Sequence, residues 1–389
     1  MGYVMSRMSR VAPVRTLVQE ALKEPVKTPS SLPNSTEGQM DQSKPIRNVL
    51  VVGGAGFVGS VLIPKLLDRG YHVRVMDSLV YGDEGIRHLN GRPRYEMVDG
   101  DLRSLESIVR SSRDADAVVH LGALVGDPAC ALDENLTLEI NLKATQNLAE
   151  VARGIGVRRF IFASTCSVYG ATDELLDETS ALGPVSLYAR SKMESEQLTL
   201  ALDNHEFSSV ALRFGTFYGL SPRPRFDLIV NMLVAKAIHD KEITIFGGDQ
   251  WRPFLHVDDG AESIVRCLEA PVETVKGQIF NVGSDDQNYT LRQIAEEIAK
   301  AISGARVVYK KPAEVEASYR VSFDKINRLL DFVPRNSLAE GIQQLAAAIQ
   351  DGEVSHYLDA RYSNIKSLTL GNGGGAPSEE RSVSADTPR

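Results

Sequence analysis

Cysteine is scarce in this chain, whose 389 residues include only Cys130, Cys166 and Cys267. Three scattered cysteines exclude a disulfide framework, and a reducing cytoplasm is the setting we expect. No apolar run reaches the roughly 20 residues that a membrane-spanning helix needs. The seven histidines show no paired spacing with cysteines or carboxylates, so we expect no metal site.

Basic residues are outnumbered in the composition. The chain has 43 Lys and Arg against 51 Asp and Glu, which gives a net charge of -8. Nucleic-acid binding needs clustered cations, so this balance argues against a nucleic-acid partner. The 43% hydrophobic content is ordinary for a globular protein, and the length fits one large or two modest domains. We therefore expect a small-molecule partner, and neither nucleic acid nor a membrane.

The two ends of the chain differ from its middle. Residues 1–46 begin with a possible amphipathic helix over 8–26, followed by a stretch rich in Pro and Ser that is typical of a partly disordered linker. Residues 361–389 are of low complexity and are predicted to form a disordered tail. Between these ends we place a dinucleotide-binding core over 47–182. Residues 183–360 are expected to add the remaining core strands, interleaved with a substrate-binding lobe.

Strand and helix patterns alternate from Arg47 onward. Apolar strands are expected at 48–52, 72–76, 94–98, 116–120 and 158–164, with helices at 104–112 and 134–153, and two later strands at 209–214 and 279–282. Such alternation predicts an α/β fold with a Rossmann-type, doubly wound parallel sheet and right-handed crossovers. Helical stretches at 228–240, 258–269, 290–303 and 338–350 are assigned to a smaller C-terminal α/β substrate lobe.

A Gly-rich turn, VVGGAGFVGS at 51–60, joins the first strand to a helix. Gly53, Gly56 and Gly59 allow a tight turn, close approach of a diphosphate and close helix–strand packing, while the helix N-terminus offers N–H groups to phosphates. Asp77 ends the second strand, 18 residues after Gly59. A carboxylate there binds both ribose hydroxyls and repels a 2′-phosphate, which favours NAD over NADP. Alone, such a turn is also found in ordinary βα connections.

A tyrosine and a lysine four residues apart, Tyr188 and Lys192, share one face of a predicted helix. A tyrosine has a pKa of about 10 in water. A neighbouring ammonium and a positive nicotinamide ring both favour the phenolate, so Tyr188 becomes a candidate base. Thr165 follows the fifth strand, where ligands of open α/β sheets bind, and is a candidate to orient the substrate. The competing interpretation of an isolated Tyr-x-x-x-Lys is a solvated helix face.

Together these motifs resemble an extended short-chain dehydrogenase/reductase, in the branch of NAD-dependent nucleotide-sugar epimerases and dehydratases. The resemblance covers about residues 47–350. Its elements are GGAGFVG (53–59), Asp77, GDL (100–102), HLGA (120–123), Asn141, STCSVYG (164–170), YARSK (188–192), RFGTFYG (213–219), FGGDQWRPFLHVDD (246–259) and FNVGS (280–284).

The resemblance implies roles for individual residues. Thr165, Tyr188 and Lys192 would be the catalytic triad, with Lys192 also on the nicotinamide ribose. The other cofactor-binding residues would be Gly53, Gly56, Phe57, Val58, Gly59, Asp77, Asp101, Leu102, Leu121, Gly122, Ala123, Asn141, Ser164 and Phe214. The substrate-binding residues would be Thr165, Cys166, Ser167, Thr216, Arg225, Asp227, Arg252 and Arg320.

The two residues after Thr165 distinguish branches of the family. Dehydratases typically carry Asp and Glu there, and decarboxylases keep a Glu at the second position, whereas this chain has Cys166 and Ser167. Small residues at these two positions resemble those of the 4-epimerases. In these enzymes a hydride leaves C4, the keto sugar rotates, and the hydride returns to the other face. We therefore expect an NAD-dependent epimerase or oxidoreductase acting on a nucleotide-diphosphate sugar. An NDP-ketosugar reductase, a dehydratase and a non-catalytic nucleotide sensor stay open.

Several positions depart from the typical epimerase. Thr216 replaces a frequent Asn, Asp227 stands where a neutral residue is common, and Arg223 and Arg225 are predicted either to bind a diphosphate or to lie in a solvated loop. Cys130 and Cys166 are either acid–base thiols at the pocket or buried hydrophobes. The resemblance also implies a homodimer through the Tyr188 helix and the helix at 134–153. The nucleotide, the sugar and the pathway are not specified by the sequence.

Overall fold

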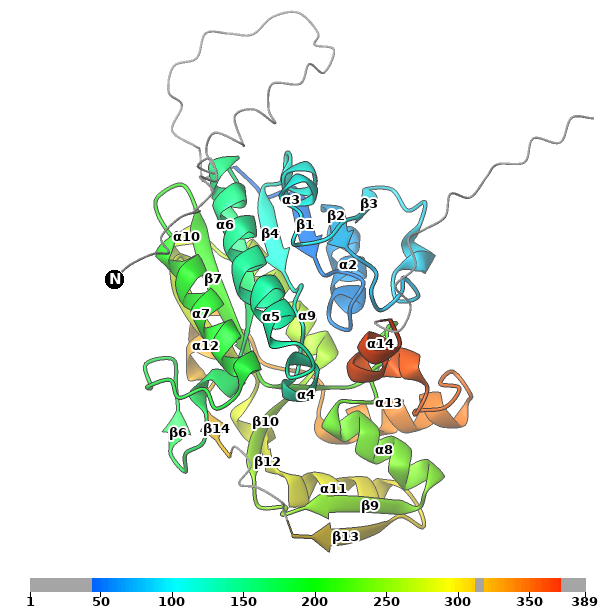
Figure 1. Ribbon diagram of the computed structural model, residues 1–389. Coiled ribbons are helices and arrows are strands. Elements are labelled where there is room, and N and C mark those ends of the chain that lie inside the picture. Colours follow the sequence, from blue (N-terminus) through cyan, green and yellow to red (C-terminus); the bar gives the residue numbers. More distant parts are fainter. Residues whose placement is uncertain (1–43, 312–317, 372–389) are drawn as a thin grey trace, which may run out of the picture.

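The computed structural model describes residues 44–311 and 318–371 (Figure 1). The predicted helix over 8–26, the linker after it and the last 18 residues of the predicted tail lie outside these ranges. The described residues form a large sheet flanked by helices, with a smaller lobe below it in Figure 1.

The central sheet has seven parallel strands in the order β11-β7-β5-β4-β1-β2-β3. All seven predicted strands are present, and their ends differ by at most one residue from the prediction. The strands are β1 (Asn48–Val52), β2 (His72–Asp77), β3 (Tyr95–Asp99), β4 (Ala117–His120), β5 (Arg159–Thr165), β7 (Ser208–Phe214) and β11 (Gln278–Val282). The Rossmann-type fold class is confirmed.

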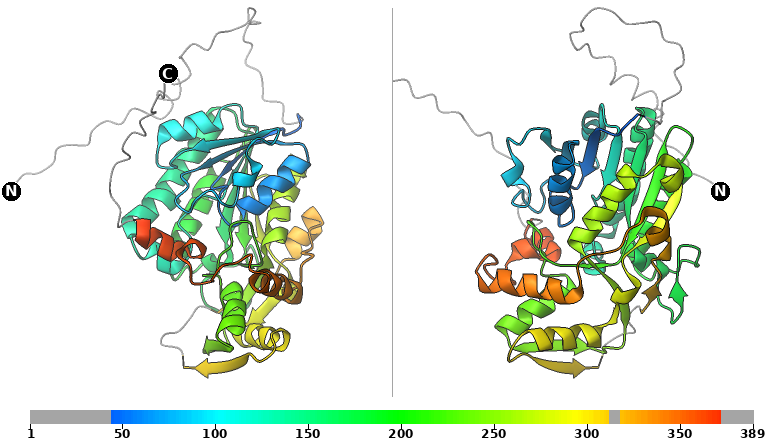
Figure 2. Two further views of the ribbon diagram at one scale, coloured as in Figure 1. Left: turned by 90° about the vertical axis from the view of Figure 1, so that its right-hand side faces the viewer. Right: turned by 180° about the vertical axis from the view of Figure 1, so that it is seen from behind.

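Helices cover both faces of the sheet, which explains why its strands are continuous apolar runs. Val49 and Val51 of β1 join the apolar core on one face, whereas Leu50 and Val52 join the core on the other, because side chains alternate along a strand. The first face packs against α2 (Gly59–Asp68), α9 (Val257–Glu269), α10 (Val272–Val275) and α12 (Asp324–Leu330). The second packs against α3 (Leu105–Ser112), α6 (Thr145–Gly154) and α7 (Leu187–Ala201) (Figure 2).

The placement of the helix at 258–269 in the substrate lobe was wrong. This helix, α9, packs beside α2 on the large sheet. Its apolar residues Ala261, Ile264, Val265 and Leu268 recur at helical spacing and are buried against the sheet. Spacing shows that such a face is buried, but it does not show against which layer.

The smaller lobe has its own apolar core. The core gathers α8 (Ile229–His239), α11 (Leu291–Ala301), α13 (Leu338–Gln350) and a two-stranded parallel sheet of β9 (Glu242–Phe246) and β13 (Arg306–Lys310). A three-stranded sheet of β8 (Thr216–Tyr218), β10 (Trp251–His256) and β12 (Asn288–Thr290) links this lobe to the large sheet. A short pair, β6 (Leu175–Leu176) and β14 (Arg320–Val321), lies at the side.

The prediction of a disordered tail from residue 361 was wrong for its first part. The chain forms a short 3-10 turn, η5 (Ala360–Tyr362), and a helix, α14 (Asn364–Gly371). Tyr362 is buried, and its ring lies 5.6 Å from that of Phe226. The low-complexity composition begins only at Gly371, so the tail prediction extended too far toward the folded part of the chain.

The described residues, 44–311 and 318–371, lack two features. No helix there is both long and apolar enough to cross a membrane. No group of three or more His, Cys, Asp or Glu side chains there is arranged to hold a metal ion.

Candidate active site

The Gly-rich turn forms a cradle at the carboxyl end of β1. Gly53 has φ +76°, and a Cβ on it would lie 2.5 Å from the Cα of Gly122, which follows β4. A Cβ on Gly59 would collide with the Gly54 backbone. A Cβ on Gly56 would meet only the Gly53 carbonyl oxygen, at 3.3 Å, among the described residues beyond its chain neighbours. The first and third glycines thus serve packing, while the space at Gly56 fits a diphosphate.

The Asp77 carboxylate is fixed at the rim of this cradle. It accepts hydrogen bonds from the backbone N–H groups of Ala55 and Leu79, both at 2.9 Å. Burial raises its pKa, although these two N–H groups oppose the rise. The arrangement fits the adenosine end of NAD, because a carboxylate can accept hydrogen bonds from the ribose hydroxyls in addition to these two N–H groups.

We expect the substitution Asp77→Ala to lower NAD affinity about 10- to 100-fold, because hydrogen bonds to a charged group contribute about 1.5–3 kcal/mol. Preference for NAD over NADP should fall at the same time, since the charge that repels a 2′-phosphate is removed. Calorimetric titration with each dinucleotide measures both effects. The control is Asp68→Ala, which removes an exposed carboxylate at the end of α2. An unchanged NAD-to-NADP ratio would contradict the assignment of Asp77.

The other predicted cofactor residues lie along the same edge of the sheet. The N–H of Gly100 donates to the Asp77 carbonyl at 3.1 Å, so the Asp101–Leu102 segment is anchored beside the ribose position. Asp101 itself pairs with Arg103 at 2.6 Å, and Leu102 is buried in the core. The remaining residues at this edge are Phe57 and Val58 before α2, Leu121, Gly122 and Ala123 after β4, and Phe214 at the end of β7.

Thr165, Tyr188 and Lys192 are brought together where β5 ends beside α7. Ser186 caps α7, because its hydroxyl accepts the Ala189 N–H at 3.2 Å and donates to Asp127 at 2.6 Å. The Tyr188 phenol is hydrogen-bonded to the Thr165 hydroxyl, which in turn donates to Ser167 Oγ at 3.1 Å. A base and a hydroxyl that orients substrate thus stand side by side.

Burial shifts the pKa values of both Tyr188 and Lys192. Burial raises the pKa of Tyr188 above its usual range, whereas the Thr165 hydrogen bond and the charge of Arg225 oppose the rise. Burial lowers the pKa of Lys192 to about 7, and the charge of Glu196 opposes that fall. Lys192 Nζ also lies 4.2 Å from the centre of the Phe162 ring. Without cofactor, then, Tyr188 is a neutral phenol, and a positive ring beside it would favour the phenolate.

The sequence analysis missed a buried ion pair, one member of which, Glu196, favours the charged form of Lys192. Glu196 lies one further turn along α7 and contacts Arg213 of β7 at 2.5 Å; both side chains are buried. Arg213 also donates to Tyr169 Oη at 2.9 Å. The sequence contained a signal for Glu196, because residues 188, 192 and 196 recur every four positions on one helix face.

Asn141 and Ser164 both bond to neighbouring parts of the protein. Asn141 lies in a π-helical turn, η2 (Glu139–Ala144), and its amide exchanges two hydrogen bonds with the Leu124 backbone and donates to Ser191. Ser164 Oγ donates to Glu196 at 2.6 Å. Both side chains thus help to position neighbouring elements, and their predicted cofactor contacts stay predictions.

The structure removes both cysteines from the chemistry. Cys166 is buried in the core and donates to the Arg213 carbonyl, and burial raises its pKa. The side chain is a small core residue, as the alternative interpretation held, and the predicted contact of this position with substrate stays a prediction. Cys130 donates to the Leu124 carbonyl at 3.4 Å, and burial raises its pKa to about 11. Both remain thiols at neutral pH and are poor bases.

The substitution Cys166→Ala should therefore leave kcat within about twofold, while costing about 1 kcal/mol of stability as a typical buried substitution does. Steady-state turnover and urea unfolding measure the two effects. Loss of turnover by more than a hundredfold in a folded variant would return Cys166 to the catalytic group.

The predicted substrate residues fall into two groups. Arg225 pairs with Asp227 at 2.9 Å, and its charge acts on Tyr188, so this pair lies near the catalytic group while its predicted contact with substrate stays a prediction. Arg252 of β10 lies 5.1 Å from the Tyr319 ring, whose hydroxyl is 3.4 Å from Ser167 Oγ. Sequence reasoning missed Tyr319, which reaches the site from 152 residues away along the chain.

The contacts of Arg320 and Thr216 are with residues other than the catalytic hydroxyls. Arg320 stacks 5.3 Å from the centre of the Trp251 ring and donates to the Asp173 carbonyl. Thr216 begins β8 and pairs with Phe254 of β10. Their predicted substrate contacts stay predictions.

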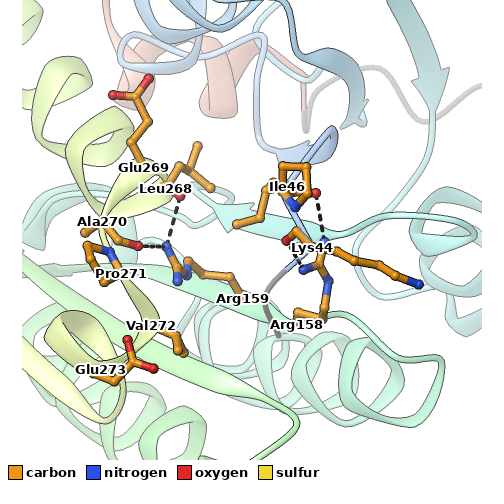
Figure 3. Close-up of a pocket in the computed structure, with 11 residues that line it drawn as sticks. Lys44, Ile46, Arg158, Arg159, Leu268, Glu269, Ala270, Pro271, Val272 and Glu273 are labelled. Atoms are coloured by element: carbon orange, nitrogen blue, oxygen red, sulfur yellow. Dashed lines mark hydrogen bonds between the residues drawn. The ribbon is translucent and has the colours of Figure 1, made fainter. Parts of the chain in front are cut away.

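A surface pocket at the opposite edge of the sheet carries no catalytic group (Figure 3). It adjoins Arg158 and Arg159, where β5 begins rather than ends. Arg159 donates to the carbonyls of Cys267, Leu268 and Ala270, and so caps the C-terminal end of α9. Arg158 donates to Asp116 at 2.9 Å, so both arginines hold elements of the fold together.

Comparison with known proteins supports this assignment. Residues 49–283 match the model of the NAD dependent epimerase/dehydratase family. UDP-glucuronic acid decarboxylase 1 of Arabidopsis thaliana is 29% identical over 77% of this chain and 69% of its own length. The uncharacterized UDP-glucose epimerase YtcB of Bacillus subtilis is 28% identical over 76% of this chain and 95% of its own.

A solved structure agrees in fold and in sequence. UDP-glucuronic acid 4-epimerase from Bacillus cereus, in complex with UDP-glucuronic acid and NAD, superposes with a TM-score of 0.71 and 28% identity, over 78% of this chain and 99% of that one. With the matched family model and the cradle at Gly56 and Asp77, it establishes NAD as the cofactor. The chain belongs to the NAD-dependent epimerase/dehydratase family.

Proposed function

We propose that this enzyme is a 4-epimerase of a UDP-linked hexose or hexuronic acid. One observation carries the choice within the family: Thr165 and Ser167 present hydroxyls beside Tyr188, while Cys166 turns its thiol into the core. Neither of the two positions after Thr165 offers a carboxylic acid. Removal of a C6 hydroxyl needs such an acid, whereas epimerisation at C4 needs only a base, an orienting hydroxyl and a hydride carrier.

The residues of the site divide the work. Bound NAD supplies the acceptor and donor of the hydride. The Tyr188 phenolate removes the proton from the C4 hydroxyl, and it returns this proton after the keto sugar has rotated in the site. Thr165 Oγ1, held by Ser167, orients the C4 oxygen. The Lys192 ammonium stabilises the phenolate, and Glu196 favours the charged form of that lysine.

The UDP part of the proposal rests on the relatives, two of which are described with UDP sugars in their names. Arg225 and Arg252 are the cations that we assign to the diphosphate of the sugar nucleotide, because guanidinium groups bind phosphate oxygens in pairs. Tyr319 is assigned to a sugar hydroxyl through its contact with Ser167.

The test is product analysis with the purified full-length enzyme and no added cofactor. UDP-glucose and UDP-glucuronic acid should each be offered, and one should give its 4-epimer at equilibrium. Release of a C6-deoxy sugar or of carbon dioxide would identify a dehydratase or a decarboxylase and would reject the proposal.

An NDP-ketosugar reductase is the second candidate, and cofactor stoichiometry separates it from the epimerase. A reductase consumes one reduced cofactor for each product, whereas an epimerase turns over many times on the dinucleotide with which it was purified. Tight NAD in the purified protein and no demand for added cofactor would exclude the reductase. Catalysis of either kind would exclude a non-catalytic nucleotide sensor.

We also propose a cytoplasmic homodimer that associates through α7 and the helices α5 (Glu134–Leu138) and α6. Leu132, Leu138 and Val185 are exposed hydrophobic residues next to these helices, and such residues favour a protein interface when they gather on one surface. Light scattering after size exclusion should give twice the 42.5 kDa of one chain. A mass of 42.5 kDa at micromolar concentration would reject the dimer.

A further inference from the structure

An arginine next to the Gly-rich turn is buried with two of its nitrogens unpartnered. Arg223 is 4% exposed. Its Nη1 donates to Asn364 Oδ1 at 2.7 Å, but its Nε and Nη2 have no hydrogen-bond partner among the described residues. Burial lowers its pKa to about 10, so it stays charged at neutral pH. A buried cation with two nitrogens left without hydrogen bonds is costly, even with the charges of Asp77 and Asp227 nearby, so the arrangement indicates that a negatively charged ligand completes it.

The neighbours of Arg223 place that ligand at the cofactor cradle. Ser221, two residues earlier, lies 3.1 Å from Ser60 in the first turn of α2. A Cβ at Gly85, in the segment that follows β2, would lie 2.8 Å from the Arg223 Cβ. The guanidinium stacks 4.5 Å from the Tyr81 ring centre, and the Tyr81 hydroxyl is also buried without a partner among the described residues. The anionic part of NAD that belongs beside the N-terminus of α2 is its diphosphate.

The C-terminal end of the described chain holds Arg223 in this position. We define residues 359–371, which form η5 and α14, as the C-terminal clamp. Besides the Arg223–Asn364 bond, the Asn364 N–H donates to Asp227 at 2.8 Å and the Phe226 N–H donates to the Tyr362 carbonyl at 2.8 Å. In Figure 1, α14 (red) lies between the large sheet and the smaller lobe, and it packs against α4 (Asp127–Cys130), which contacts the catalytic helix α7.

We propose that the C-terminal clamp retains the cofactor: Asn364 fixes Arg223 so that its Nε and Nη2 bind the diphosphate of NAD. Asn364 is then a positioning residue and Arg223 a cofactor-binding residue. Arg225, two positions further along the chain, pairs with Asp227 instead, and its charge opposes the rise in the pKa of Tyr188 that burial causes. The loop of residues 219–228 thereby directs Arg223 to the cofactor and Arg225, which we assigned to the diphosphate of the sugar nucleotide, to the substrate side near Tyr188. This inference rests on NAD binding and is independent of which sugar is the substrate.

Two other anions were weighed against the NAD diphosphate. The diphosphate of the sugar nucleotide would have to reach the first turn of α2, on the cofactor side of the sheet. The 2′-phosphate of NADP would face the half-buried carboxylate of Asp77, which the charge of Arg223 also reaches. Both alternatives become separate outcomes of one binding series.

The experiment measures binding to cofactor-free enzyme without any sugar substrate. NAD, NADP, ADP-ribose, adenosine and UDP are titrated into wild type and Arg223→Met by calorimetry. We expect NAD and ADP-ribose to bind about 10- to 100-fold more weakly to the variant, because two charge-assisted hydrogen bonds are lost. Adenosine and UDP should bind as to wild type. The matched control is Arg361→Met, which removes an exposed arginine of the same clamp and should change nothing.

Each contrary outcome identifies a different error. Unchanged NAD affinity would overturn the proposal, and so would a loss of UDP affinity equal to that of NAD, or a loss confined to NADP. A second variant, Asn364→Leu, leaves Arg223 in place but removes its anchor. It should bind UDP normally and release NAD faster than wild type in a stopped-flow displacement assay. Equal release rates would reject the clamp. If Arg223→Met fails to fold, Asn364→Leu and Arg223→Lys supply the same comparison.

Discussion

Replacing Tyr188 with Phe should lower kcat about 10²- to 10⁴-fold, the range that a positioned general base contributes. The phenol is the group that removes the substrate proton, and the neighbouring hydroxyls of Thr165 and Ser167 have ordinary alcohol acidity and cannot replace it. The aromatic ring stays in place, so the fold and the cofactor cradle should be preserved. Steady-state kinetics with the UDP sugar that the enzyme converts gives the kcat, and calorimetry gives the NAD affinity.

The control for this variant is Tyr169→Phe. Tyr169 is a buried phenol in the same part of the core, bonded to Arg213 and Asn281 rather than to Thr165. It should lose stability without a comparable loss of kcat in the folded fraction. A Tyr188→Phe enzyme with wild-type turnover would show that another group is the base.

Replacing Glu196 with Gln should destabilise the protein by about 3–5 kcal/mol, because removal of one partner leaves the Arg213 charge buried and uncompensated. The same change should act on catalysis through Lys192. The Glu196 charge raises the pKa of Lys192 against the effect of burial, so without it the lysine loses its proton below its present pKa of about 7. Activity that depends on the ammonium should then fall at a lower pH than in wild type.

Urea unfolding measures the first effect, and a profile of kcat from pH 5.5 to 9 measures the second. The matched control is Glu194→Gln, which removes the same charge from the same helix, two positions from the buried pair. A purely structural role for Glu196 would lower stability and leave the pH profile of the folded enzyme unmoved, and this outcome would contradict the electrostatic link to Lys192.

Most of the fold was predictable because it depends on local patterns. Apolar runs marked each strand of the large sheet, and the Gly-rich turn and Asp77 marked the edge at which we expect the cofactor. Tyr188 and Lys192 were found by helical spacing, and Glu196 could have been found by extending the same rule one turn further.

The rest depends on contacts between distant segments, which spacing does not encode. Tyr319 meets Ser167 across 152 residues, and Arg223 meets Asn364 across 141. The layer that α9 covers is likewise decided by α2 and the sheet, not by the sequence of α9 alone. The C-terminal clamp was mistaken for part of a tail because a compositional boundary at Gly371 was placed ten residues too early.

The most direct test of the account is the fate of the hydrogen at C4. The UDP sugar is prepared with deuterium at C4 and converted in ordinary water, and the product is analysed by mass spectrometry and NMR. Epimerisation through Tyr188 and bound NAD predicts that the deuterium stays at C4 with inverted configuration, and that turnover with labelled sugar is no faster than with unlabelled sugar. Loss of the deuterium to solvent, with inversion at C4, would contradict the account.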